Sequence, residues 1–166
     1  MKVKQNFFKC AFLLTALTML AIARPAIAGD QVPFKGQETG VITTTSFRFP
    51  LDTKVVVAEG EATQFGHYTL LGNFVVDVRF GSVTGTYTIT TDNGDMLFLT
   101  MEGAVVPTDF TKTILNFTVI GGTGRFESAT GNYTAYNQLA FRAGTSPNPY
   151  VGQLEGVLST PGANKK

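Results

Sequence analysis

The sequence predicts an all-β protein: an eight-stranded antiparallel up-and-down barrel with one short helical turn. Three observations lead to this fold class. Alternating runs rich in β-branched and aromatic residues recur over 41–160, short turn signals separate most of them, and helical periodicity never exceeds one turn. A two-sheet sandwich also fits this pattern. Glycines inside four runs favour the barrel, whose strands must coil sharply: Gly60, Gly72, Gly85 and Gly156.

A targeting segment precedes the first run. Residues 1–28 combine early lysines, a mainly apolar run over 11–23 and the motif Ala26-Ile27-Ala28. This order predicts a secretory signal peptide cleaved after Ala28. The apolar run is shorter than the about 20 residues that a membrane-spanning helix needs. We therefore predict a secreted or periplasmic protein with no membrane span in its mature chain.

The mature chain, 29–166, is predicted to form a single barrel domain. Residues 29–40 contain glycines and Pro33 without any period, and predict a mobile lead-in. The predicted strands then span 41–49, 53–63, 66–77, 82–91, 96–104, 111–120, 132–141 and 150–160. Pro50 ends the first of them, because proline cannot donate to a strand ladder.

Turn chemistry separates the later strands. Asn93-Gly94 lies between the fourth and fifth runs and is the strongest short-range hairpin signal. Proline-containing loops are predicted over 105–110 and 143–149, before the sixth and eighth runs, and residues 161–166 form a polar tail.

Charge and cysteine content exclude several classes of protein. Of 13 basic and 12 acidic residues, four basic ones lie in the signal peptide, which leaves nine against twelve and a net charge of −3. The remaining basic residues are scattered, so the basic stripe that nucleic-acid binding requires is missing. The single cysteine, Cys10, also lies in the signal peptide. The mature domain must therefore be stable without disulfides.

A glycine-rich stretch joins the sixth and seventh runs and closes one end of the predicted barrel. It contains Gly121, Gly122, Gly124 and Gly131, which supply positive-φ conformations. Residues 125–130 are long enough for about one helical turn, which would place Phe126 and Ala129 together on the inside. A phosphate-binding loop is excluded, because no Gly-Lys-Ser/Thr sequence and no long helix follow.

The same stretch carries a resemblance. Gly121, Gly122, Gly124, Phe126 and Gly131, with Arg125 between them, are similar to the G-G-T-G-x-F-x-x-A-x-G segment of dirigent proteins and allene oxide cyclases. A second segment, 60–69, resembles one in bacterial secreted, uncharacterised proteins that carry the same glycine motif. The resemblance implies a calycin-like barrel related in shape to the lipocalins. In those families the matched glycines and Phe126 shape the barrel, so no activity is implied.

Few residues suggest chemistry. His67 is the only histidine, and with Glu59 and Glu61 nearby it can be part of a weak ligand site. A solvated polar face beside a bend is the simpler interpretation. Asp92-Asn93-Gly94-Asp95 lacks the distal glutamate of a calcium loop, and no nucleophile motif occurs. We therefore predict no metal, no cofactor and no catalytic residue, with Glu61 and His67 as ligand-binding candidates.

These observations favour a non-catalytic binding protein for a small apolar or aromatic ligand, since an eight-stranded barrel is just wide enough to hold one. An isomerase or cyclase that uses Glu61 or His67, and a structural barrel with a filled interior, are the alternatives. The fifth run places apolar residues on both faces, among them Met96, Leu97, Phe98 and Leu99. Exposed apolar strand faces indicate partners, so a homo-oligomer is also expected.

Overall fold

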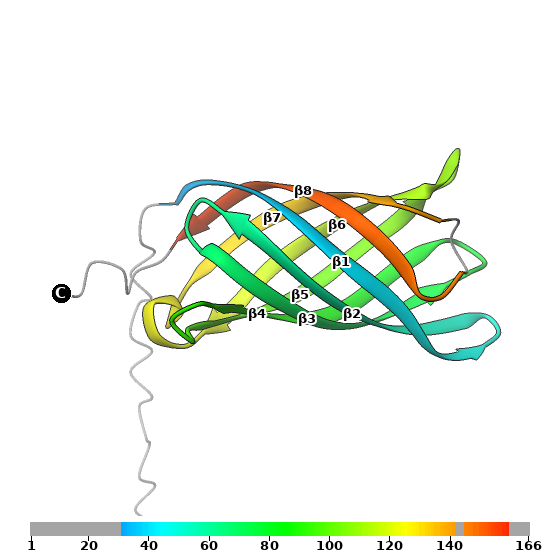
Figure 1. Cartoon of the computed structure of the whole chain (residues 1–166), viewed down its shortest axis with the longest axis horizontal. Helices are drawn as coiled ribbons and strands as arrows, with labels where there is room; N and C mark the ends of the chain where they lie inside the picture. Colours follow the sequence, from blue (N-terminus) through cyan, green and yellow to red (C-terminus); the bar gives the residue numbers. More distant parts are fainter. Residues whose placement is uncertain (1–30, 142–144, 160–166) are drawn as a thin grey trace, which may run out of the picture.

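A computed structural model of the chain describes residues 31–141 and 145–159. Its eight strands form one closed antiparallel barrel in which each strand pairs with its sequence neighbours (Figure 1). The strands are β1 Val32–Arg48, β2 Leu51–Ala62, β3 Gly66–Asp77, β4 Ser82–Thr91, β5 Met96–Val106, β6 Asp109–Gly122, β7 Thr130–Leu139 and β8 Asn148–Ser159. Pairing of β1 with β8, from Val32↔Leu158 to Ile42↔Asn148, closes the ring. The predicted barrel is confirmed and the sandwich is excluded.

Alternating burial follows from the pleat of the strands. Side chains of successive residues point to opposite faces, and along β3 and β7 buried and exposed residues alternate accordingly. The buried set fills the interior with aromatic and aliphatic groups; Phe34, Tyr68 and Phe126 are exposed by 1% or less. Burial of each such side chain contributes about 1.5–3 kcal/mol. Without disulfides, this interior is what stabilises the barrel.

The glycine-rich stretch plugs one end of the barrel. Gly121, Gly124 and Gly131 have φ values of 136°, 56° and 155°, which glycine adopts without strain. The chain between them forms a short 3₁₀ helix, η1 Gly124–Phe126, in place of the longer turn predicted over 125–130. Phe126 packs edge-on against the Phe65 ring with centroids 5.4 Å apart. Both Phe126 and Ala129 are buried, as predicted.

Arg125 of the plug is used inside the structure. Its guanidinium donates to the backbone carbonyl of Phe65 over 3.0 Å, lies 3.7 Å from the Asp95 carboxylate and stacks over the Phe126 ring. These contacts tie the plug to the β2–β3 and β4–β5 connections. They account for Arg125 without a ligand.

The connections divide between two ends. The plug end carries the β2–β3 and β4–β5 turns together with η1; the rim end carries the β1–β2, β3–β4, β5–β6 and β7–β8 hairpins (Figure 1). The predicted Asn93-Gly94 hairpin is confirmed at the plug end, where Gly94 has φ 84° and its N–H donates to the Thr91 carbonyl over 2.8 Å.

One local prediction is wrong. Residues 32–40, expected to be a mobile lead-in, are the first half of β1 and pair with both β2 and β8. Phe34 and Glu38 are buried there while Lys35 and Gln37 are exposed. The alternation is genuine, but Gly36 and Gly40 occupy inward positions and hide it in the sequence.

Parts of the chain lie outside the described residues. These are the predicted signal peptide 1–28 with its cleavage after Ala28, the first two residues of the predicted loop 143–149 and the tail 161–166. Within 31–141 and 145–159, the structure contains no helix with the length and apolar character needed to cross a membrane.

Candidate functional site in the barrel interior

A carboxyl group lies in the interior of the barrel. Glu38 of β1 points inward and is only 5% exposed. The Tyr68 hydroxyl donates to its Oε2 over 3.1 Å, and the Tyr150 hydroxyl donates to its Oε1 over 2.9 Å. Isolated carboxyl groups are costly to bury, so two donors on the two oxygens are what make this position tolerable.

Glycines on neighbouring strands make room for this arrangement. Tyr68 pairs across the ladder with Gly60, and Tyr150 pairs with Gly40. A Cβ atom at Gly60 would lie 2.6 Å from the Tyr68 hydroxyl oxygen, and one at Gly40 would lie 2.8 Å from Cε1 of Tyr150. Each tyrosine ring therefore packs over a glycine of the neighbouring strand, and its hydroxyl reaches Glu38.

The same pairing recurs beside Glu38. Tyr87 faces Gly72, where a Cβ would lie 2.5 Å from its ring, and Tyr133 faces Gly156. The glycines that predicted strand coiling thus also accommodate interior tyrosines. The exception is Gly85, which faces Phe74.

Two polar atoms near the carboxyl have no partner among the described residues. They are the Tyr133 hydroxyl oxygen and Oδ1 of Asn137, both buried. The Asn137 Oδ1 would lie 2.5 Å from a Cβ at Gly152, which itself pairs with Glu38. The ring of Tyr133 stacks on that of Phe117 with centroids 4.8 Å apart, and its centroid lies 4.9 Å from that of Phe34. Buried polar groups are normally hydrogen-bonded, so unpaired ones indicate where a ligand or water can be held.

Burial dominates the protonation of this cluster. Desolvation raises the pKa of Glu38, and the hydrogen bonds from Tyr150 and Tyr68 oppose this with a smaller effect. Burial, reinforced by the negative charge of Glu38, also raises the pKa of Tyr150 and of Tyr133. Burial therefore disfavours ionisation of the carboxyl group and of the phenols around it.

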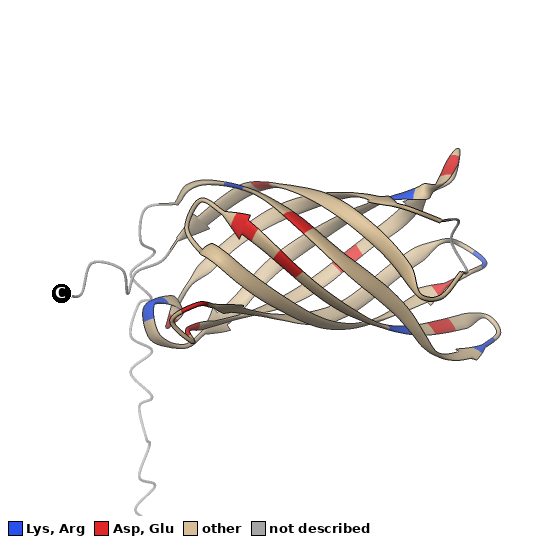
Figure 2. Ribbon diagram, viewed as in Figure 1, with Lys and Arg blue, Asp and Glu red and all other residues tan. Residues whose placement is uncertain are grey.

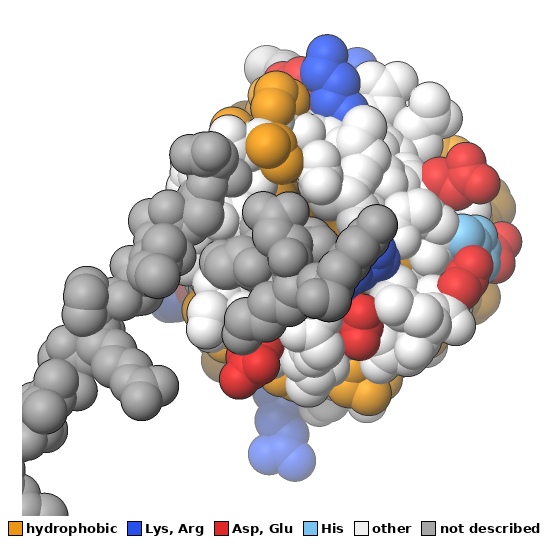
Figure 3. Space-filling model, turned by 90° about the vertical axis from the view of Figure 1, so that its left-hand side faces the viewer, with side chains coloured by type: hydrophobic (Ala, Val, Ile, Leu, Met, Phe, Trp, Pro, Cys, Tyr) orange, Lys and Arg blue, Asp and Glu red, His pale blue; other side chains and the backbone are white. Residues whose placement is uncertain are grey.

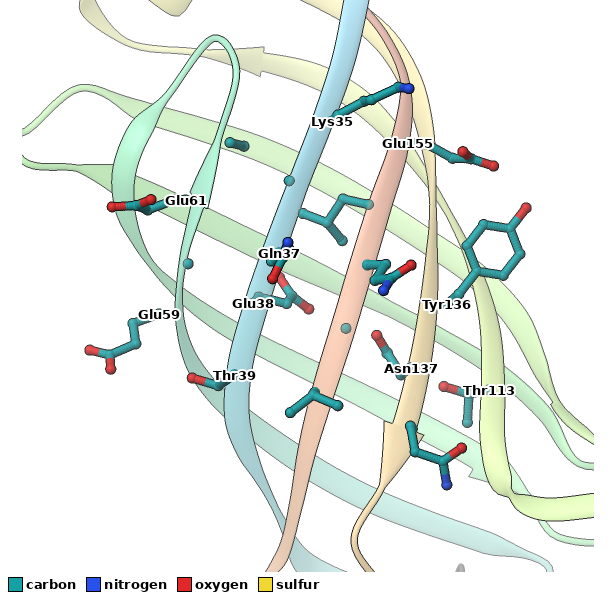
Figure 4. A pocket seen from close by; sticks show the side chains of 18 of the residues that line it. Lys35, Gln37, Glu38, Thr39, Glu59, Glu61, Thr113, Tyr136, Asn137 and Glu155 are labelled. Atoms are coloured by element: carbon teal, nitrogen blue, oxygen red, sulfur yellow. The ribbon is translucent and has the colours of Figure 1, made fainter.

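A hollow of about 1540 Å³ lies along the wall over β2, β1, β8, β7 and β6. Figure 4 shows outward side chains of its lining, including Gln37, Glu59 and Tyr136. The lining also includes the inward-facing Glu38 and Asn137. Where β1, β2 and β8 carry glycine, the wall between this hollow and the buried carboxyl is thin.

The two predicted ligand-binding residues lie on the outside. Glu61 and His67 are paired directly across β2 and β3, are exposed and line the outer hollow. Nδ1 of His67 lies 2.8 Å from the Asp92 carboxylate, whose hydrogen bond and charge raise the pKa of the imidazole. Figure 3, which faces the plug end, shows acidic side chains beside the histidine. The structure does not bring Glu61 or His67 to Glu38, and their binding role stays a prediction.

The described residues contain no group of three side chains able to hold a metal ion. Sequence reasoning missed Glu38 and its tyrosines because their association depends on strand register. A usable signal was present, since an acidic residue between two inward glycines is unusual in an otherwise apolar strand face.

Two solved structures resemble this barrel. The pterocarpan synthase dirigent protein PsPTS1 matches with a TM-score of 0.50 and 11% sequence identity, over 78% of this chain and 94% of that chain. The chain has a dirigent-like barrel fold. The pterocarpan synthase dirigent protein GePTS1 matches with a TM-score of 0.49 and 14% identity, over 78% of this chain and 84% of that chain. No family model and no curated protein sequence matches the chain.

Proposed function

We propose that this protein binds a small, largely apolar or aromatic molecule that carries a hydroxyl or carbonyl group, next to Glu38 in the dirigent-like barrel. The observation that carries the proposal is the buried Glu38–Tyr68–Tyr150 cluster with the unpartnered Tyr133 hydroxyl and Asn137 Oδ1 beside it. The aromatic interior supplies apolar contact, and the unpaired polar atoms supply orientation. Ligand sites combine mostly apolar walls with a few such polar groups.

The chain offers a matched pair of variants for testing this proposal. Tyr133 is buried with an unpaired hydroxyl, whereas Tyr136 is exposed on the outer wall. Tyr133→Phe removes a hydroxyl that no described residue uses, so the barrel should keep its stability. If a ligand uses that hydroxyl, its affinity should fall about threefold to tenfold. Tyr136→Phe should change neither stability nor affinity.

The probe for this measurement is 2-naphthol, an aromatic molecule with one hydroxyl, titrated by its own fluorescence. Native mass spectrometry of protein purified from its own host looks for a natural ligand in parallel. Saturable 2-naphthol binding that weakens in Tyr133→Phe and not in Tyr136→Phe supports the proposal. No binding of the probe, together with no co-purified ligand, overturns it.

A second candidate is a cofactor-independent isomerase or cyclase. It is favoured by one observation: burial raises the pKa of Glu38, so the carboxyl can act as a proton donor in a water-poor interior. The names of the two similar structures describe synthases. Incubation with a metabolite extract of the host should then produce a new isomer of unchanged mass. Glu38→Gln should abolish its formation, whereas Glu61→Gln on the outer wall should not.

The export and assembly of the protein belong to the same proposal. The predicted signal peptide supports secretion, and the mass of the mature protein from its host should correspond to a chain that starts at Gly29. The outer face of β5 exposes Met96 and Phe98, which supports a homo-oligomer. The glycine motif, Gly121 to Gly131, supports kinship with allene oxide cyclases and a bacterial secreted branch.

A further inference from the structure

Every hairpin at the rim end carries an exposed phenylalanine. Phe49 of β1–β2 is 74% exposed and Phe80 of β3–β4 is 76% exposed. Phe110 of β5–β6 is 62% exposed, and Phe141 of β7–β8 is 55% exposed. Phe47 adds a second exposed ring to the first hairpin. We call Phe49, Phe80, Phe110 and Phe141 the phenylalanine rim.

Exposed phenylalanines are costly, and their distribution here is systematic. The four rings belong to four separate turns that meet only because the barrel places alternate hairpins at one end. None of them contributes to the interior. Large apolar groups gathered on an exposed surface indicate a contact surface.

The charges at this end suit an anionic partner. Its acidic groups are neutralised in pairs: Asp52 by Lys54 at 2.8 Å, Asp77 by Arg79 at 2.6 Å and Asp109 by Lys112 at 2.9 Å. Arg48, between Phe47 and Phe49, is exposed, and its side chain makes no ion pair or hydrogen bond with any described residue. The rim end therefore carries a positive charge on a chain whose mature part has a net charge of −3. Figure 2 shows the basic residues of this end at its hairpins.

The shape of the rim distinguishes between partners. The phenylalanines project from four separate turns, and each ring is exposed by 55% or more. A rigid protein would need four matching pockets. A lipid surface deforms around each ring, and it binds apolar groups flanked by basic residues at its headgroup boundary.

We propose that the rim end docks on a lipid bilayer, with the four rings in the headgroup–acyl boundary and Arg48 near anionic headgroups. This inference goes beyond the proposed ligand site and does not depend on it. The barrel would stand on the membrane with its plug end facing away.

Co-sedimentation with vesicles of phosphatidylcholine, with and without phosphatidylglycerol, tests the proposal. The wild-type mature protein should bind, more tightly when phosphatidylglycerol is present and less tightly as salt is added. Each of Phe49→Ser, Phe80→Ser and Phe110→Ser should weaken binding on the order of tenfold. The matched controls are Val57→Ser, Leu71→Ser and Val151→Ser, which remove apolar groups that are more than half exposed on the outer wall and should bind like the wild type.

Tryptophan fluorescence gives a second, independent measurement, since the chain contains no tryptophan. Phe80→Trp should shift its emission to the blue on vesicle addition and be quenched by brominated lipid. Leu71→Trp on the wall should do neither. Absence of vesicle binding overturns the proposal, as does equal weakening by rim and wall substitutions. If the protein self-associates, does not bind vesicles, and loses its self-association on rim substitution, the membrane proposal is overturned. The partner of the rim is then a second copy of the chain. Tyr133→Phe, which tests the interior ligand site, should bind vesicles as the wild type does. The vesicle measurement therefore stands even if the ligand-site proposal is overturned.

Discussion

Tyr150 donates its phenolic hydrogen to Oε1 of Glu38 over 2.9 Å, although 112 positions of sequence separate the two residues. Closure of the barrel between β1 and β8 produces the contact, and Gly40 opposite Tyr150 gives the ring its space. The hydrogen bond therefore depends on closure of the barrel, and it lies within the polar cluster of the candidate site.

Glu38 should make stability depend on pH. Burial raises its pKa above 4.5, so between 4.5 and its folded value the unfolded chain is ionised while the folded protein keeps the proton. The folded state then binds more protons, and stability falls as pH rises, by about 1.4 kcal/mol per unit of pH within that window. Glu38→Gln removes this slope. Urea denaturation of both proteins at several pH values measures the difference, and parallel pH profiles would contradict the assignment.

The Tyr150 hydroxyl should contribute measurably to folding. Tyr150→Phe leaves one buried oxygen of Glu38 without its donor, which costs about 1–2 kcal/mol. Tyr136→Phe, on the exposed tyrosine of the outer wall, should stay within about 0.5 kcal/mol of the wild type. Equal effects of the two substitutions, measured by urea denaturation, would show that the Glu38 contact adds nothing.

Gly60 should be coupled to Tyr68. A methyl group at Gly60 would collide with the Gln37 carbonyl oxygen and lie 2.7 Å from Cζ of Tyr68, so Gly60→Ala must displace both the backbone and the ring, at about 1–3 kcal/mol. In a Tyr68→Leu background the ring is gone and the cost should shrink. A double-mutant cycle measures this coupling. Additive effects would mean that the backbone alone requires glycine at this position.

Gly124 should be needed for folding, with no selective effect on binding. Its φ of 56° and the contact that a Cβ would make with the Asp95 carboxylate together predict a loss of about 2 kcal/mol or more for Gly124→Val. Ser128 of the same plug has φ 65°, so Ser128→Gly should not destabilise. Thermal unfolding checks both, and a stable Gly124→Val protein that no longer binds 2-naphthol would contradict the plug interpretation.

His67 should titrate above its ordinary pKa of 6.5, because the Asp92 carboxylate stabilises the imidazolium. The stabilisation is complete below 6.5 and is lost as pH rises through the raised folded value. NMR titration of the imidazole should show this pKa return toward 6.5 in Asp92→Asn. An unchanged titration curve in that variant would show that the contact is not formed in solution.

Local chemistry made much of the fold predictable. Asn93-Gly94 specifies its hairpin through positive φ, and the spacing of Phe126 and Ala129 places both inside the plug. The site was not predictable in the same way. The contacts of Glu38 depend on the three-dimensional structure. Its partners, Tyr68 and Tyr150, can be assigned only once the register of the strands around β1 is known. Glycines at 36 and 40 also removed the inward side chains that would have identified the strand.

The pairing of Val32 with Leu158 also means that the ring of strands has no privileged starting point. A circular permutant that joins β8 to β1 by a linker and opens the turn between β5 and β6 keeps every ladder. In such a chain only the end of β8, the linker and the start of β1 separate Tyr150 from Glu38 in sequence. The order of synthesis would change while the interior cluster stayed the same.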